Sequence, residues 1–264
     1  MTTPSTAAPG VFAPHPGAAS LPSMIRSHAA MEVRLLLRNG EQLLLAVVIP
    51  LLVLVGGTMA TGVLAMGSGR RIDILTPGVM ALAVLSTSFT SVAIATGFER
   101  RYGVLKRLGA SPLPRTGLLA GKAVAVLAIQ TGQLGLICLV ALAMGWQPQG
   151  GLLAVAVVLV LVGVGTAAFA ALALAMAGTL RAEATLAAAN LVFVLLLAFG
   201  AIVVPMASYP PGLQPVVGLL PSGALAEGMR QALTGGALPW ASIAVLAAWS
   251  AAGVALSARS FRWE

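Results

Sequence analysis

The sequence predicts an all-α membrane protein with six transmembrane helices. Apolar residues occupy 59% of the 264 positions and charged residues only 8%, with a mean hydropathy of +0.99. A soluble domain carries about 25% charged residues because its surface faces water. The apolar runs are continuous in Leu, Ala and Val and lack the alternation of a barrel strand, so they favour helices that bond their own backbone within the bilayer.

The charge-free runs place the six spans, because about 20 apolar residues are needed to cross roughly 30 Å of hydrocarbon. Three of the runs are long enough for one span each. The run between Lys122 and Arg181 accommodates two, with a polar turn at 146–151, and the run after Glu183 holds one span followed by a Pro-rich outer segment. The predicted helices lie near residues 43–66, 74–98, 118–145, 152–177, 184–205 and 238–258.

The basic residues are distributed unevenly between the two sides of the membrane. The net charge of +8 is compatible with nucleic-acid binding, but this distribution argues against it. With both termini in the cytoplasm, the outer segments hold only Arg70, Arg71 and Arg230. The inner segments hold the other twelve cationic residues, which are Arg26, Arg34, Arg38, Arg100, Arg101, Lys106, Arg107, Arg115, Lys122, Arg181, Arg259 and Arg262. This positive-inside pattern predicts orientation in the plasma (inner) membrane and contact with anionic lipid head groups.

The chain before the first span divides into two segments. Residues 1–22 are rich in Pro, Ala, Ser and Thr without the apolar core of a signal peptide, so we expect a disordered cytoplasmic tail. Residues 23–41 are predicted to form an amphipathic interface helix whose basic face carries Arg26, Arg34 and Arg38, although Glu32 interrupts its apolar face. The transmembrane domain then covers 42–258, and 259–264 form a short cytoplasmic tail.

The chemistry of a membrane enzyme is missing from the predicted spans. None of the seven acidic residues and neither His lies within a span, which disfavours a metal centre, a catalytic triad or proton coupling. Cys138 is interpreted as a small apolar residue. The run from Gly117 to Lys122 resembles a phosphate-binding loop but is one residue short and lacks the Ser or Thr. We therefore expect no metal and no cofactor in this chain.

The long inner loop after the second span, residues 99–113, has the features of a docking segment. Glu99, Arg100 and Arg101 close the span, and Gly103 permits a sharp bend. A short amphipathic stretch then runs to a Ser-Pro pair, with apolar side chains at helical spacing beside Lys106 and Arg107. Such a helix can dock into a groove on a cytoplasmic partner. A solvated, positively charged loop is the alternative that the residues alone leave open.

This run, Glu-Arg-Arg-x-Gly-x-Leu-Lys-Arg-Leu-x-x-Ser-Pro, resembles the signature of ABC-2-type exporter permeases, which include drug, lipid and polysaccharide export subunits. The order of the predicted helices resembles that family over most of the chain, including short outer helices that end at residues 227–233. The resemblance implies that the loop contacts a separate ATPase subunit. The residues that would take this coupling role are Glu99, Arg100, Arg101, Gly103, Leu105, Lys106, Arg107 and Leu108.

The resemblance also implies the partners. Two copies of a cytoplasmic ABC ATPase would bind ATP and Mg²⁺, and a second permease, identical or related, would complete the path in the lipid membrane. The apolar composition favours a lipophilic drug or a lipid-like molecule as substrate. Small residues on the fourth span, Gly163, Gly165, Ala167, Ala168 and Ala171, favour close helix packing, although biased composition alone can explain them. The alternatives are a membrane scaffold or assembly factor, and an integral membrane enzyme.

Overall fold

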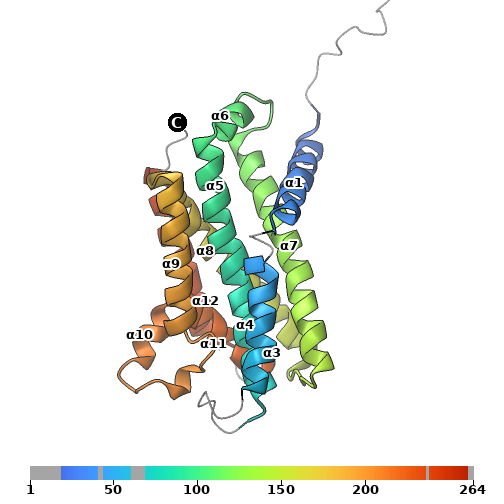
Figure 1. Cartoon of the computed structure of the whole chain (residues 1–264), viewed down its shortest axis with the longest axis vertical. Coiled ribbons are helices and arrows are strands. Elements are labelled where there is room, and N and C mark those ends of the chain that lie inside the picture. Colours follow the sequence, from blue (N-terminus) through green and yellow to red (C-terminus); the bar gives the residue numbers. More distant parts are fainter. Residues whose placement is uncertain (1–18, 41–43, 61–68, 236–237, 261–264) are drawn as a thin grey trace, which may run out of the picture.

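The computed structural model describes residues 19–40, 44–60, 69–235 and 238–260, and these contain helices but no strands. Figure 1 shows the long helices running side by side, with α6 at one end of the bundle and α11 toward the other. We call these the α6 end and the α11 end. Five helices in the described residues are long and apolar enough to cross a membrane. The predicted all-α class is therefore confirmed.

The described elements follow in chain order. They are α1 (Leu21–Arg38), the π-helix η1 (Leu44–Val48), α3 (Ile49–Met59), α4 (Arg71–Leu85), the π-helix η2 (Ser86–Ser91), α5 (Val92–Arg101), α6 (Val104–Gly109), α7 (Arg115–Ala143), α8 (Gly151–Thr179), α9 (Ala182–Phe199), the 3₁₀ turn η3 (Met206–Ser208), α10 (Gln214–Leu219), α11 (Pro221–Leu233) and α12 (Trp240–Ser260).

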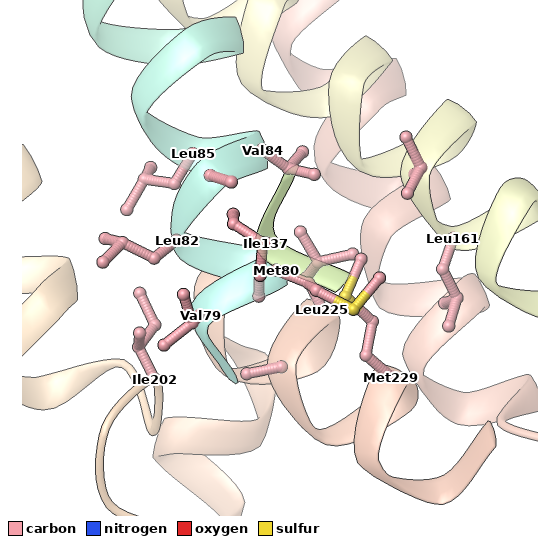
Figure 2. Close-up of a cluster of buried hydrophobic side chains, with 14 of the residues drawn as sticks. Val79, Met80, Leu82, Val84, Leu85, Ile137, Leu161, Ile202, Leu225 and Met229 are labelled. Carbon is pink, nitrogen blue, oxygen red and sulfur yellow. The ribbon is translucent and has the colours of Figure 1, made fainter. Parts of the chain in front are cut away.

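Elements α4, η2 and α5 form one continuous helical rod, Arg71–Arg101, at the centre of the bundle. In its most apolar stretch, 94% of the residues are buried inside the protein. In the corresponding stretches of the other four long helices, the buried share is 17% to 50%. Figure 2 shows the packing around α4, where Val79, Met80 and Leu82 face side chains from several other elements. Those side chains include Ile137 of α7, Leu161 of α8, Ile202, and Leu225 and Met229 of α11.

The middle of this rod is polar, which the apolar-run argument did not predict. All six residues of η2, Ser-Thr-Ser-Phe-Thr-Ser, are buried. Two glutamines of α7 provide hydrogen-bond partners: Thr87 donates to Gln133 Oε1 at 2.7 Å, and Gln130 donates to Ser88 Oγ at 2.6 Å. Thr166 of α8 donates to Gln130 Oε1 at 2.9 Å. A π-helical segment inside an α-helix is frequently found at functional sites.

The small residues of α8 divide into two groups. Gly165 lies against Leu225 of α11, and Ala171 lies against Gly253 of α12, so these positions permit close approach of helices. Ala168 is fully buried. Gly163 and Ala167 are exposed. The prediction of a close-packing surface therefore holds for three of the five residues.

The fifth span ends earlier than predicted. Its expected range was 184–205, but α9 stops at Phe199, and Ala201 adopts a positive φ of 53°. The chain turns here because Arg230 of α11 donates to the Ile202 carbonyl at 2.8 Å and holds it against Gly78. Arg230 is itself buried, with Glu227 at 3.7 Å. The Pro-rich segment then folds as short helices, including α10 and α11.

The first predicted span, 43–66, is only partly within the described residues. Positions 44–59 are helical as η1 and α3, with a described apolar helix from Ala46 to Met59. The rest of that prediction falls at 43, 60 and 61–66, of which 60 is non-helical and the others lie outside the described residues. Of the predicted tail at 1–22, only 19–22 are described, and α1 already begins at Leu21. Of the predicted tail at 259–264, the first two residues still belong to α12, and the rest lie outside the described residues.

The α8–α12 contact yields a stability prediction. A Cβ at Gly253 would lie 2.8 Å from the Ala171 Cβ and 3.0 Å from the Leu172 backbone nitrogen, so Gly253→Ala forces the two helices apart. We expect a loss of about 1–3 kcal/mol in the free energy of unfolding, seen as a lower midpoint of thermal unfolding in detergent. Gly163→Ala is the matched control, since nothing lies within 4 Å of its added Cβ. Equal midpoints for both variants would contradict this packing.

Candidate functional site

The α6 end of the molecule gathers the residues that the sequence singled out. Helix α5 ends at Arg101, and Gly103 takes a left-handed conformation with φ of 66°, which favours glycine. This residue caps α6, whose six residues lie beyond the end of the rod (Figure 1). Ser111 then closes the helix by donating to the Leu108 carbonyl at 2.6 Å. The predicted bend and short helix are confirmed, but the loop starts at Tyr102, because Glu99, Arg100 and Arg101 still belong to α5.

Two arginines attach the end of α5 to the connection between α8 and α9. Arg100 donates to the backbone carbonyls of Gly178 and Leu180, the second at 2.7 Å. These carbonyls lie at the end of α8, where helix carbonyls lack partners within the helix. Arg101 forms an ion pair with Glu183 in the first turn of α9. The two side chains therefore connect the rod to the neighbouring pair of helices.

The two cationic side chains of α6, those of Lys106 and Arg107, are exposed to solvent. Within this pair, the Arg107 side chain donates a long hydrogen bond of 3.5 Å to the Tyr102 carbonyl. Leu108 is half-buried, and Leu105 is described only by its place in the helix. Tyr102 is 61% exposed, with its ring stacked on Phe98. The structure thus presents two cations and an aromatic ring to whatever lies beyond this end.

Glu99 faces inward and pairs with a lysine from another helix. Lys122 of α7 lies 2.8 Å from Glu99 Oε1 and 3.1 Å from Glu32 Oε1 of α1. His28 Nε2 lies 3.5 Å from the same Glu32 oxygen. The structure therefore pairs Glu99 with Lys122 and not with the neighbouring Arg100 or Arg101. These side chains, here called the Lys122 cluster, join α1, α5 and α7 at one point.

The cluster is largely removed from solvent. The side chains of Glu32 and Lys122 are 7% and 15% exposed, and that of Glu99 is 17% exposed. Burial lowers the pKa of His28 below its usual value, which outweighs the opposing effect of the Glu32 carboxylate. Glu32, which interrupted the apolar face of the predicted interface helix, is therefore on the side of α1 that packs against α7. Arg26, Arg34 and Arg38 are exposed on α1.

The run that resembled a phosphate-binding loop is part of α7 and packs against α1. A Cβ at Gly117 would lie 3.2 Å from Leu21, and one at Gly121 would lie 2.5 Å from His28. The two glycines are four residues apart, so they lie on one face of α7 and let α1 approach closely. Figure 1 shows α1 alongside this part of α7. Lys122, the last residue of the run, is held by carboxylates.

A groove lies between the rod and helices α7, α8 and α12. Its volume is about 330 Å³, and its lining is almost entirely apolar, apart from Lys122 and Thr166. Gly163 and Ala167, the two small residues of α8 that do not pack against a neighbouring helix, also line it. Within the described residues, no group of three or more His, Cys, Asp or Glu side chains is arranged to hold a metal ion.

Sequence reasoning missed the Lys122 cluster as a unit. Glu32, Glu99 and Lys122 are separated by 67 and 23 residues, and each was considered in its own segment. One sequence feature could have indicated the cluster: a charged residue next to a span requires a partner of opposite charge when its helix is buried. Glu32 and Lys122 lie within two of the predicted helices and Glu99 directly follows a third, all on one side of the membrane. Only the packing of those helices determines which of the charges meet.

The Lys122 cluster yields a second prediction. Lys122→Met leaves two carboxylates near each other without their cation, and removing one partner of a buried ion pair costs about 3–5 kcal/mol. We expect a markedly lower thermal midpoint in detergent. The triple variant Glu32→Gln, Glu99→Gln, Lys122→Met has no unpaired charge, so much of the stability should return. If the triple variant is no more stable than Lys122→Met, the ion pairs do not explain the loss.

Comparison with known proteins identifies the family. The model of the ABC-2 type transporter family matches residues 25–234, which cover the helices from α1 to α11. A comparison with curated proteins found no match. The family consists of membrane components that work with an ABC ATPase, in agreement with the apolar helices and with the sequence resemblance. The chain therefore belongs to the ABC-2 type transporter family and is a multi-pass transmembrane permease of an ABC transporter.

Proposed function

We propose that this chain is the non-catalytic permease subunit of an ATP-driven exporter and that α6 receives the movement of a separate ATPase subunit. The observation that carries the proposal is the position of α6. This short helix lies outside the bundle with exposed Lys106 and Arg107, yet it follows directly from the buried central rod. A force applied to α6 would therefore reach the part of the protein with the most internal contacts.

The proposed orientation places the α6 end in the cytoplasm. Arg100, Arg101, Lys106, Arg107 and Arg181 all belong to this end, as expected from the positive-inside rule. In this arrangement η1 and α3 belong to the first of six spans. Helix α1 is the interface helix, and α11 is an outer helix that does not cross the bilayer. Both termini would then be cytoplasmic in the plasma membrane.

The contacts at the α6 end support a coupling role. Arg100 and Arg101 connect α5 to the ends of α8 and α9, and the Lys122 cluster connects α5 to α1 and α7. A displacement of α6 would consequently be shared by four neighbouring helices rather than absorbed by one loop. In the proposed assembly, two ATPase copies bind ATP and Mg²⁺, and a second permease faces this one.

The apolar groove beside Lys122 supports a lipophilic or lipid-like substrate. Its lining offers dispersion contacts along most of its length and few hydrogen-bond partners. A sugar chain would lose its hydrogen bonds to water in such a groove without replacement. Export of a molecule with a large apolar part is therefore the proposal that fits the lining.

The partnership is tested by affinity purification of the full chain from its native membrane. We expect an ATPase with a phosphate-binding loop to copurify and its ATP hydrolysis to accelerate when a lipophilic substrate is added. Copurification of partners that contain no such ATPase would refute the exporter proposal and would favour a scaffold or assembly factor instead.

The coupling role is tested by reversing the exposed charges of α6. Lys106→Glu with Arg107→Glu should leave the fold intact, since neither side chain contacts the bundle beyond the weak bond to Tyr102. ATPase association and ATP-driven transport should fall at least tenfold, because repelling charges at an interface typically cost several kcal/mol. Arg259→Glu, also exposed at this end, is the matched control. Transport at the unmodified rate in the α6 variant would exclude this coupling assignment.

A further inference from the structure

A basic pocket lies at the α6 end, beside α6 but separate from it. It has a volume of about 380 Å³ and is lined by Gly97, Arg100 and Arg101 of α5 together with Arg181, Ala182 and Glu183. Below it, α5 and α9 come together where Gly97 meets Thr185. The volume is within the range of about 300–1,000 Å³ that is typical of sites for small ligands.

The lining of this pocket carries more positive than negative charge. Three arginines face one carboxylate, Glu183, which already pairs with Arg101. Arg100 is held by the carbonyls of Gly178 and Leu180, which orient its guanidinium without neutralising it. Arg181 is exposed, and in the described part of the chain no carboxylate lies within ion-pair distance of it. The pocket therefore has two positive charges that no acidic group among the described residues balances.

The position of the pocket favours a membrane lipid as the source of the balancing anion. It lies where α5, α8 and α9 end, which is the depth of the lipid head groups if the α6 end is cytoplasmic, as the proposed function requires. Helix α9, which forms one wall, has only 22% of its apolar stretch buried inside the protein. A lipid can therefore place its acyl chains along α9 and its phosphate in the pocket. Basic pockets between helices on the cytoplasmic side are known to bind anionic head groups.

We propose that this pocket binds the phosphate head group of an anionic phospholipid of the inner leaflet. Arg181 and Arg100 contact the phosphate, and the acyl chains extend along α9. The pocket shares Arg100 and Arg101 with the contacts that fasten α5 to α8 and α9. A bound lipid therefore stabilises the arrangement on which the proposed coupling through α6 depends.

The test measures lipid affinity of the full-length chain in detergent by native mass spectrometry. The probes are phosphatidylglycerol and phosphatidylcholine of equal chain length. Arg181→Gln should raise the dissociation constant of the tightest phosphatidylglycerol about fivefold and leave that of phosphatidylcholine unchanged, because one arginine near the membrane surface contributes about that factor. Arg259→Gln, an exposed arginine at the same end but outside the pocket, should change neither constant.

Three results would overturn the proposal. The first is an unchanged phosphatidylglycerol affinity in Arg181→Gln. If that variant also fails to bind the ATPase, the pocket serves the protein partner and not a lipid. The second is an equal loss of phosphatidylglycerol affinity in Arg259→Gln, because the overall positive charge of the protein would then explain the effect without the pocket. The third is displacement of the lipid by an equal concentration of inorganic phosphate, which would make a free anion the ligand. The measurement needs no ATPase, so failure of the exporter proposal in copurification is distinguished from failure here.

Discussion

The rest of the structure depends on the burial of one helix on all sides. The rod Arg71–Arg101 is the only long described helix that is enclosed along almost its whole apolar length. In a lipid bilayer the tails are as apolar as a leucine, so helices associate through close packing and hydrogen bonds rather than through the hydrophobic effect. A helix at the centre makes the most packing contacts and the most hydrogen bonds, since every neighbouring helix can contact it. The two glutamines of α7 and the short helix α11 pack directly against this rod.

The polar residues of the bundle follow from the same constraint. A hydroxyl or amide in the membrane interior is stabilised by a protein partner, because no water is available there. Most of the hydroxyls of η2 have such a partner, Thr90 being an exception. Gln130 and Gln133, three residues apart on α7, face η2 and bond to Thr87 and Ser88. The buried side chains of the rod are thus polar in its middle, at η2, and mostly apolar on either side. The π-helical geometry of η2 coincides with this polar stretch. A change in helix register here would require these hydrogen bonds to exchange partners together.

The α6 end combines rigid connections with an exposed surface. Carbonyls at the end of α8 bind Arg100, Glu183 binds Arg101, and the Lys122 cluster binds the same helix from its other side. Helix α5 is consequently held from two directions immediately before Gly103, where the backbone turns. Charges that point inward here serve the fold, whereas Lys106 and Arg107 point outward and remain available. The cationic loop seen in the sequence therefore contains both residues that pack inward and residues that are exposed.

The sequence by itself determined the membrane class, the approximate helix positions and the short helix after Gly103, because these follow from local composition, run length and turn chemistry. The residues proposed for coupling came from the resemblance of one loop to the signature of a known family, since the loop residues alone left a solvated segment equally open. The sequence did not determine that Glu99 turns inward to Lys122 or that Glu32 belongs to a packed face. Nor did it determine that α9 stops at Phe199, where Arg230 holds the following turn. These depend on charges and carbonyls that meet across helices far apart in the chain. Only the packing of the helices brings them together, since no local pattern records which helix lies beside which.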